Sequence, residues 1–238
     1  YLTNLEEVAK LEICGVHYEE NTLGSENEVV HVIARTAGAK RKYFYRKREY
    51  GSWTPWEKIN LKIEDNPVMP LVWKNRLFLF WLDLMKETQH EIPTTPSGKN
   101  LADINPSEAF PNKEPTLVFK DILNWSEYLD NKWHPARTSD PSAPLFIGSA
   151  TLSEANTFNR SNLRLSAIFW VDGGLIIIVS PEVGVGSSFF LYNPFSIPEI
   201  REQKKQAHFS PKRLLDTNTT SFKITYSDMA ISHSILSN

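Results

Sequence analysis

The sequence predicts an all-β protein built from antiparallel sheets, with a short helix near its first residues. Runs of β-branched and aromatic residues, separated by turns that contain Gly, Asn or Asp, occupy most of the 238 residues. Two kinds of segment occur twice, which favours a tandem of similar sheets such as part of a β-propeller. A β-sandwich, which also contains many hairpins, is the alternative architecture.

The composition excludes several classes of protein. Hydrophobic residues at 41% and charged residues at 23% are globular values, which excludes collagen-like, coiled-coil and disordered chains. The net charge of −2 argues against a dedicated nucleic-acid binder. A single cysteine, Cys14, cannot form a disulfide within the chain. The first ten residues lack the pattern of a signal peptide, and no apolar run is long enough for a membrane-spanning helix.

Capping and turn signals define the first elements. Asn4, followed three residues later by a glutamate, has the spacing of a capping box, which predicts a helix over Leu5–Leu11. Strands are predicted over Val29–Thr36 and Lys42–Glu49, because both are rich in β-branched and aromatic residues. The Gly-containing segment Ala37–Ala39 supplies the turn between them.

A strongly apolar hairpin follows. After a weaker strand at Thr54–Ile63, the segments Leu71–Trp73 and Arg76–Trp81 are predicted to pair across a turn at Lys74–Asn75. The second strand of this hairpin is the most continuously apolar stretch of the first half of the chain.

A proline-rich segment divides the predicted domain. Residues 86–115 hold five of the 15 prolines and are predicted to form an exposed loop or linker. It separates a first β unit, residues 1–85, from a second β unit of the same domain, residues 116–238. The strands predicted in the second unit are Thr116–Tyr128, Leu163–Trp170, Leu175–Val179, Phe189–Tyr192 and Ser221–Tyr226.

Both repeats combine tryptophan with a turn. Leu71–Phe80 resembles Ile168–Ile178, in which an apolar strand ends in Trp and a second apolar strand follows a polar turn. Glu49–Pro55 resembles Glu127–Pro135, in which a turn leads into Trp-x-Pro. The latter turns resemble degraded Asp-box turns of sialidase-type propellers, which are structural elements and not catalytic ones. The expected fold is therefore sialidase-like.

The most conspicuous local feature is a cationic and aromatic segment, residues 40–48, with six Lys or Arg residues and three aromatic residues. In a strand, neighbouring side chains point to opposite faces, so the charge is divided between two surfaces. We therefore expect pairing with nearby acidic residues, or an intersubunit contact, and not nucleic-acid binding. The candidates for a charged interface are Lys40, Arg41, Lys42, Arg46, Lys47 and Arg48.

Catalytic and metal chemistry have little support in the sequence. Four strand arginines could be nominated for a substrate carboxylate, although no spacing selects them: Arg35, Arg46, Arg76 and Arg164. The six histidines are scattered, without a pair at helical spacing, so no metal site is predicted. We nominate no catalytic residue and no cofactor.

Several segments carry a family resemblance. His31–Thr36, Tyr43–Asn60 and Val72–Trp81 closely resemble the neuraminidase-like domain of the A subunit of bacterial insecticidal toxin complexes, the Tc toxins. The opening Tyr1–Ile13 is similar to the way that domain begins. The match continues more loosely to about Val179.

The resemblance implies a part of a much larger assembly. In that family the A subunit forms a secreted or cell-surface pentamer, in which an outer shell surrounds a translocation channel and opens when the pH changes. The neuraminidase-like domain closes the shell, and sialidase activity is not its accepted role. The implied partners are other domains of the same subunit and neighbouring protomers, without nucleic acid and without a membrane span in this segment.

Three functions follow from these observations. The leading hypothesis is a non-catalytic closure and assembly domain that responds to pH. The first alternative is a glycan-binding β module, whose stacking candidates are Trp53, Trp56, Trp125 and Trp133. The second alternative is an active sialidase-type glycosidase, which would need an arginine cluster and a Tyr nucleophile activated by Glu.

Overall fold

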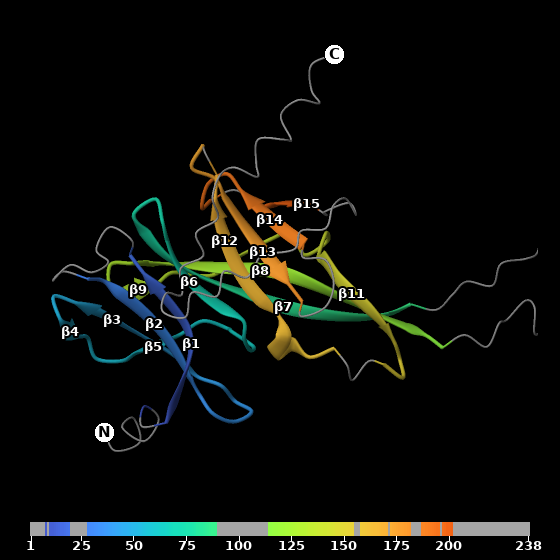
Figure 1. Cartoon of the computed structure of the whole chain (residues 1–238), viewed down its shortest axis with the longest axis horizontal. Helices are drawn as coiled ribbons and strands as arrows, with labels where there is room; N and C mark the ends of the chain where they lie inside the picture. Colours follow the sequence, from blue (N-terminus) through green and yellow to red (C-terminus); the bar gives the residue numbers. More distant parts are fainter. Residues whose placement is uncertain are drawn as a thin grey trace, which may run out of the picture. The chain divides into compact units, whose positions relative to one another are not determined.

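The structure is a computed structural model, and its strands form three antiparallel sheets of consecutive strands (Figure 1). This confirms the predicted class. All the described residues belong to the unit formed by residues 1–205. The structure describes residues 8, 10–19, 28–89, 114–154, 158–170, 172–181, 187–195 and 197–201.

Each sheet takes up one stretch of the sequence. The first sheet contains β1 (Leu11–Tyr18), β2 (Val30–Thr36), β3 (Tyr43–Glu49), β4 (Ser52–Trp53) and β5 (Glu57–Ile59). The second contains β6 (Val68–Trp73), β7 (Arg76–Gln89), β8 (Thr116–Leu129), β9 (Lys132–Trp133), β10 (Arg137–Thr138) and β11 (Leu145–Thr151). The third contains β12 (Arg164–Phe169), β13 (Leu175–Ser180), β14 (Ser187–Leu191) and β15 (Glu199–Arg201), and a short 3₁₀ helix, η4 (Arg160–Asn162), precedes it.

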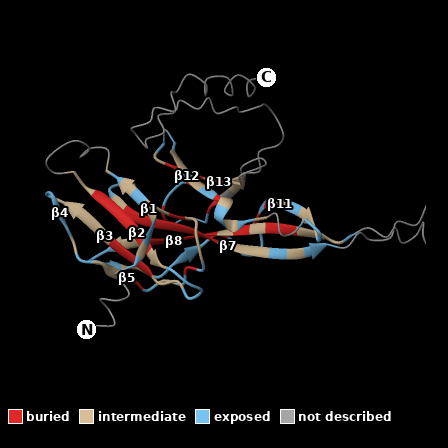
Figure 2. Cartoon of the chain, turned by 60° about the horizontal axis from the view of Figure 1, so that its bottom comes forward, coloured by how far each residue is buried: buried red, intermediate tan, exposed pale blue. Residues whose placement is uncertain are grey.

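The second sheet lies between two hydrophobic cores, because β7 buries both of its faces. Leu77, Leu79 and Trp81 pack with residues of the first sheet. The residues between them, Phe78 and Phe80, pack with residues of the third sheet. Burial in β7 is continuous from Leu77 to Leu82, and Figure 2 shows buried segments in β2, β3 and β8 as well. A continuous apolar run in an antiparallel strand is the sequence signature of such two-sided burial.

The Trp-x-Pro repeat is confirmed as one local structure that occurs twice. Trp53 of β4 pairs with Arg48, and Trp133 of β9 pairs with Tyr128, each across a two-residue turn. The residue after each tryptophan then donates its backbone N–H back to the first long strand, at 2.9 Å in both cases. A short strand, β5 or β10, next returns to the same long strand, β3 or β8. All four turn residues have positive φ, as two-residue hairpins require.

The other repeat also forms two hairpins, and these contact each other. The indole Nε1 of Trp73, at the end of β6, donates to the carbonyl of Gly173 at 3.0 Å. Gly173 lies in the turn between β12 and β13, where its φ of 76° favours glycine. The ammonium group of Lys74 reaches the carbonyl of Tyr192 at 3.4 Å. The sequence repeat therefore marks a contact between the second and third sheets.

One feature of the predicted architecture needs correction. Leu11, the last residue of the predicted helix, opens β1, where it pairs with Thr36. Among the described residues only Val8 of that helix is helical, and residues 5–7 and 9, like the predicted strand Ser221–Tyr226, lie outside the described residues. The described strands form three sheets and no closed propeller, and the partial propeller and the sandwich both stay predictions.

Some strand lengths also differ from the prediction. β7 continues beyond Trp81 to Gln89, and β8 begins at Thr116, so the two strands pair along their whole length. Lys86–Gln89, expected in the proline-rich loop, therefore belong to a strand, whereas residues 90–113 lie outside the described residues. The weakly alternating segment Thr54–Ile63 forms only the short β5.

A close approach of two strands makes one glycine essential to the packing. β1 lies against β6, and a Cβ atom at Gly15 would come within 2.6 Å of the Cδ atom of Pro70 and 3.1 Å of the carbonyl oxygen of Val68. Neither atom belongs to a flexible side chain. Glycine is therefore required where the first and second sheets meet.

We predict that Gly15→Ala lowers the free energy of unfolding by about 1–3 kcal/mol, the usual effect of overpacking a core. Urea denaturation followed by tryptophan fluorescence would measure this loss. Gly148→Ala is the matched control, because no atom lies within 4 Å of the Cβ position there. Equal midpoints for the two variants would contradict the close approach of β1 to β6.

Candidate functional site

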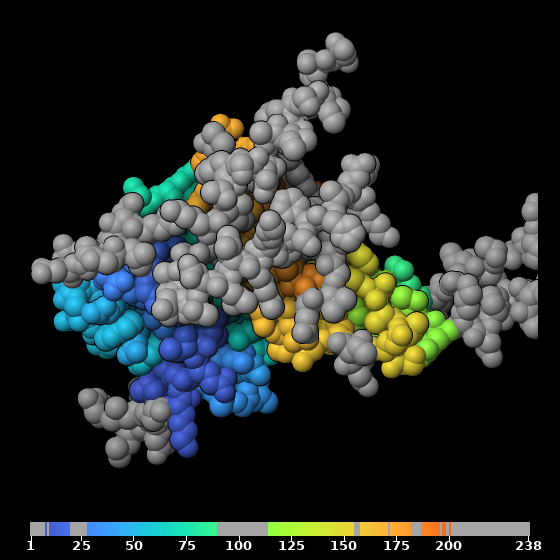
Figure 3. Space-filling view, viewed as in Figure 1, coloured from blue at the N-terminus to red at the C-terminus, as the bar shows by residue number. Residues whose placement is uncertain are grey.

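A cavity of about 520 Å³ lies where β1, the start of β6 and the segment before β12 come together. In the space-filling view, blue residues of the first strands and gold residues near position 160 border teal residues between them (Figure 3). The polar residues that line the cavity are Arg35, Arg41, Asp65, Asn66, Asn159, Arg160, Ser161 and Arg164. Each sheet, or the segment leading into it, therefore contributes to one cavity.

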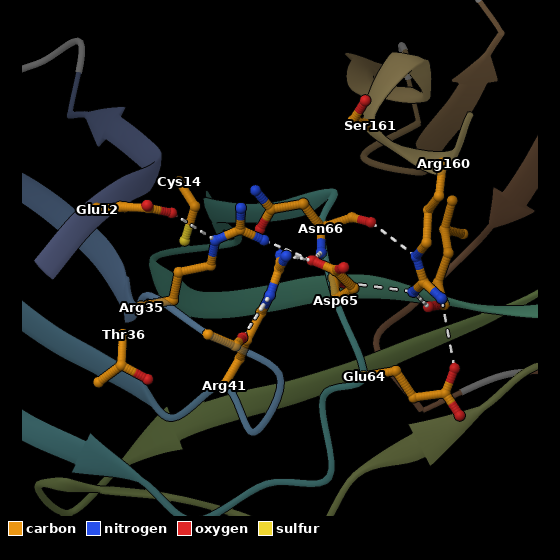
Figure 4. A network of polar contacts seen from close by, with 12 residues as sticks. Glu12, Cys14, Arg35, Thr36, Arg41, Glu64, Asp65, Asn66, Arg160 and Ser161 are labelled. Carbon is orange, nitrogen blue, oxygen red and sulfur yellow. Dashed lines mark hydrogen bonds and ion pairs between the residues drawn. The ribbon is translucent and has the colours of Figure 1, made fainter.

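Asp65 is the acceptor at the centre of this cavity (Figure 4). Its Oδ1 atom accepts hydrogen bonds from the guanidinium groups of Arg35, in β2, and Arg41, in the turn before β3. The same atom accepts the backbone N–H of Asn66 at 2.7 Å. Arg35 also contacts the carboxylate of Glu12 at 3.4 Å. Two cations and one shared carboxylate thus fix the linker before β6 onto the first sheet.

Arg160 fixes the same linker onto the third sheet. Its guanidinium group donates to the carbonyl of Asn66 at 2.8 Å and to that of Asp65 at 3.3 Å. It also donates to the carbonyl of Leu82 at 2.5 Å, where β7 extends beyond Val68, the first residue of β6, and it contacts Glu64 at 3.3 Å. Arg160 therefore satisfies backbone carbonyls that strand pairing leaves open.

The structure brings together two of the four nominated arginines. Arg35 and Arg164 both line the cavity, whereas Arg46 and Arg76 lie elsewhere. Among the described residues, Arg164 donates only to carbonyls of its own segment, those of Ser161 and Leu163. Arg160 and Asp65 were not predicted from the sequence, because Asp65 lies in a loop and Arg160 in a three-residue 3₁₀ helix, where periodicity carries no signal.

The cations of residues 40–48 largely find partners within the chain. Arg41 pairs with Asp65, Lys47 with Glu49 at 2.6 Å, and Arg48 with Glu28 at 2.9 Å. Arg46 stacks between Trp53 and Trp56, with its guanidinium carbon 4.3 Å from each ring centroid. The backbone N–H of Lys42 bonds the hydroxyl of Thr36 at 3.0 Å, and Lys40 is exposed in the turn. The expected alternation is confirmed for Tyr43 and Tyr45, which face the core between the first two sheets.

The four tryptophan candidates have different environments. Trp125 is only 2% exposed, and its indole N–H donates to the carbonyl of Pro194. Trp133 packs against Tyr45 and Tyr128. Trp53 is 45% exposed, but Arg46 covers one face of its ring. Trp53 therefore presents more free ring surface than Trp125 or Trp133.

A second polar chain, away from the cavity, connects Glu19, His31 and Tyr45. His31 Nδ1 lies 2.9 Å from the Tyr45 hydroxyl, and its Nε2 lies 2.9 Å from Glu19. Tyr45 is buried, and burial raises its pKa well above the usual range, so it cannot act as a nucleophile on a substrate in solution. These three side chains form a structural hydrogen-bond network.

Two histidines of this region make the fold sensitive to acid. His17 pairs with His31 across β1 and β2, and their rings stack with centroids 6.2 Å apart. Burial, together with the neighbouring His31, lowers the pKa of His17 from 6.5 to about 4, and burial also lowers the pKa of His31. The folded state therefore favours neutral rings, and stability falls as the pH decreases from 6.5 toward 4.

The remaining ionisable groups of the cavity region add no reactive centre. Burial raises the pKa of the Cys14 thiol to about 12, and its sulfur contacts the carbonyl of Ile33. Among the described residues, no cluster of three His, Cys, Asp or Glu side chains is arranged to hold a metal ion. The described part of the chain also contains no helix long and apolar enough to cross a membrane.

Asp121 is an ionisable group inside the core between the second and third sheets. It pairs with Leu84 of β7 and Leu145 of β11, and neither of its carboxyl oxygens has a hydrogen-bond partner among the residues that the structure describes. Burial raises its pKa from 3.8 to about 7, against the opposing charge of Arg160. The carboxyl group is therefore mainly protonated below neutral pH.

Comparisons with known proteins identify related domains. A family model described as "Neuraminidase-like domain" matches residues 11–172. The cryo-EM structure of Morganella morganii TcdA4 matches with a TM-score of 0.52 and 18% identity, over 84% of this chain and 8% of that chain. The structure of Yersinia pseudotuberculosis TcaA-TcaB matches with a TM-score of 0.36 and 16% identity, over 87% of this chain and 9% of that chain. No curated protein matches. The chain thus spans less than a tenth of either structure's chain.

We predict that Asp121→Asn stabilises the protein at alkaline pH and has little effect near pH 4. Because the folded-state pKa of Asp121 is raised to about 7, the wild type loses stability as the pH rises from about 4 to 7, and the variant does not. The expected gain at pH 8.5 is about 2–4 kcal/mol, measured by urea unfolding across the pH range. Asp172→Asn, at an exposed turn, is the control. A gain of the same size at pH 4.5 would exclude titration of Asp121 as the cause.

Proposed function

Because this chain belongs to the neuraminidase-like domain family, we propose that it is a non-catalytic shell and closure domain of a Tc-type toxin A subunit. Its role there is to contribute to assembly and to the pH-dependent opening of the shell. The observation that carries this proposal is the state of the cavity arginines. The guanidinium groups of Arg35, Arg41 and Arg160 already donate to Asp65, Glu64 and backbone carbonyls.

The same arrangement argues against sialidase chemistry in the cavity. Such an enzyme needs guanidinium groups that are free to bind a substrate carboxylate, and a Tyr nucleophile activated by a Glu. Tyr43 is the tyrosine whose pKa is affected by the charges of Arg35, Asp65 and Arg160 in the cavity. It is buried, and burial raises its pKa above the usual range. The Tyr128 hydroxyl does contact Glu57 at 2.7 Å, but neither residue lines the cavity. The arginines therefore join the sheets and do not bind a substrate.

Groups that respond to pH are built into the interfaces between sheets. The His17 and His31 pair lowers stability in acid, as the sign of its pKa shifts requires. Asp121, between the second and third sheets, lowers stability as the pH rises toward 7. Between about pH 4 and 6.5 the two kinds of group act in opposite directions: acid weakens the packing at the first sheet, whereas a rise toward neutral pH weakens the packing between the second and third sheets. Such site-specific sensitivity to pH supports a role in opening.

The partners in this proposal are other parts of the large subunit and neighbouring protomers. Lys40 is exposed in the turn between β2 and β3, and it has no ion pair among the residues that the structure describes. It is therefore the cation of residues 40–48 that is most available to a neighbouring protomer. Localisation in this proposal follows the assembly, secreted or at the cell surface.

The alternatives make different demands on the same residues. A glycan-binding module would use the exposed face of Trp53, and replacement of Trp53 by Ala would then abolish retention on an immobilised glycan. A sialidase would release the fluorophore from a fluorogenic sialoside, and Arg35→Ala would abolish that release. We expect neither activity above the level of buffer alone.

We predict that Lys40→Glu, placed in a full-length toxin A subunit that carries this domain, shifts the midpoint pH of shell opening by about one unit or more. The reason is that a charge reversal converts an attractive contact between protomers into a repulsive one. Electron microscopy of particles across a pH series would give the fraction of open shells.

Lys58→Glu serves as the matched control, because Lys58 is an exposed cation of the same sheet, in β5. It should leave the opening profile unchanged. Identical profiles for wild type, Lys40→Glu and Lys58→Glu would count against Lys40 as an intersubunit contact. If the wild-type particle opened at no pH, that result would count against the closure role itself.

A further inference from the structure

A second cavity, of about 450 Å³, lies at the other end of the β6–β7 hairpin from the arginine cavity. The first cavity is lined by the start of β6, whereas the second is lined by the start of β7, which follows the turn after β6. The end of β8, the segment after β9 and the loop after β14 complete it. The residues of interest are Arg76, Trp125, Glu127, His134, Arg137 and Phe195.

The charges in this cavity leave one cation without an acidic partner. Arg76 forms an ion pair with Glu127. Arg137 forms none with any residue that the structure describes, and it is exposed. The charged side chains of the lining, Arg76, Glu127 and Arg137, give a formal net charge of +1, which suits a single carboxylate and not a polyanion.

The apolar rim of the cavity is held in a fixed position. Phe195 is 54% exposed, and the guanidinium carbons of Arg76 and Arg137 lie 5.2 and 4.8 Å from its ring centroid. The loop that carries it is fixed by the bond from Trp125 Nε1 to the carbonyl of Pro194, at 3.0 Å. Leu129, 42% exposed, adds a second apolar side chain to the lining. The exposed ring of Phe195 is therefore held beside two cations, where a ligand can contact it without rearrangement of the loop.

We propose that this second cavity docks an acidic side chain, flanked by apolar residues, from another polypeptide segment. The carboxylate would accept hydrogen bonds from the guanidinium group of Arg137, and its apolar neighbours would cover Phe195 and Leu129. A free small carboxylate would form the polar contacts and not the apolar ones. The proposal rests on the assembly function in one respect only, namely that the larger assembly supplies the segment.

The test compares two synthetic peptides, Ac-Phe-Glu-Leu-NH₂ and its amide counterpart Ac-Phe-Gln-Leu-NH₂, added to the isotope-labelled chain. Chemical-shift titration should show the acidic peptide binding about tenfold more tightly than the amide peptide. Arg137→Gln should remove this preference. Arg164→Gln, the matched control in the first cavity, should retain it. Phe195→Ala should weaken the binding of the acidic peptide by severalfold.

Three outcomes would overturn the proposal. The first is equal binding of the two peptides, and the second is an unchanged preference in Arg137→Gln. The third is binding of sodium acetate as tight as that of the acidic peptide, which would identify a site for small anions. Arg137 is exposed, so its replacement should leave the fold intact, and unchanged spectra elsewhere would verify this. The opening assay with Lys40→Glu is independent of all three outcomes.

Discussion

The structure depends first on the two-sided burial of β7. Successive residues from Leu77 to Leu82 alternate between two cores, one shared with the first sheet and one shared with the third. The middle sheet therefore loses solvent contact on both faces along this part of β7, and the outer sheets are held by the apolar area that this removes from water. The polar networks decide the finer arrangement, because they act where the strands end and backbone groups remain unpaired.

The linker Glu64–Asn66 is where the polar networks connect the sheets that apolar burial brings together. Its carboxylate at Asp65 holds the first sheet through Arg35 and Arg41, and its carbonyls hold the segment before the third sheet through Arg160. Arginines that converge on a cavity therefore serve as cross-links between sheets. This is the physical basis for our proposal that the domain is an assembly element, in a family whose name derives from an enzyme.

Much of the fold could be predicted from local patterns, whereas the site could not. The strands around Ile33, Phe44 and Phe78 follow from β-branched and aromatic runs, and the Trp-x-Pro repeat at Trp53 and Trp133 proved to be one structure formed twice. Asp65 and Arg160 are 95 residues apart, one in a loop and the other in a three-residue 3₁₀ helix, so neither spacing nor periodicity could bring them together. The predicted helix extended too far at Leu11, because this residue pairs with Thr36 of β2.

The cavity arginines are committed to the fold, and the stability of Arg160→Gln measures this commitment. Arg160 donates to three backbone carbonyls in the linker and β7, whereas Arg164 donates, among the described residues, only within its own segment. We predict that Arg160→Gln lowers the free energy of unfolding by about 2–3 kcal/mol and Arg164→Gln by less than about 0.5 kcal/mol, measured by urea denaturation. Equal small losses in both variants would show that the cavity arginines do not hold the sheets together.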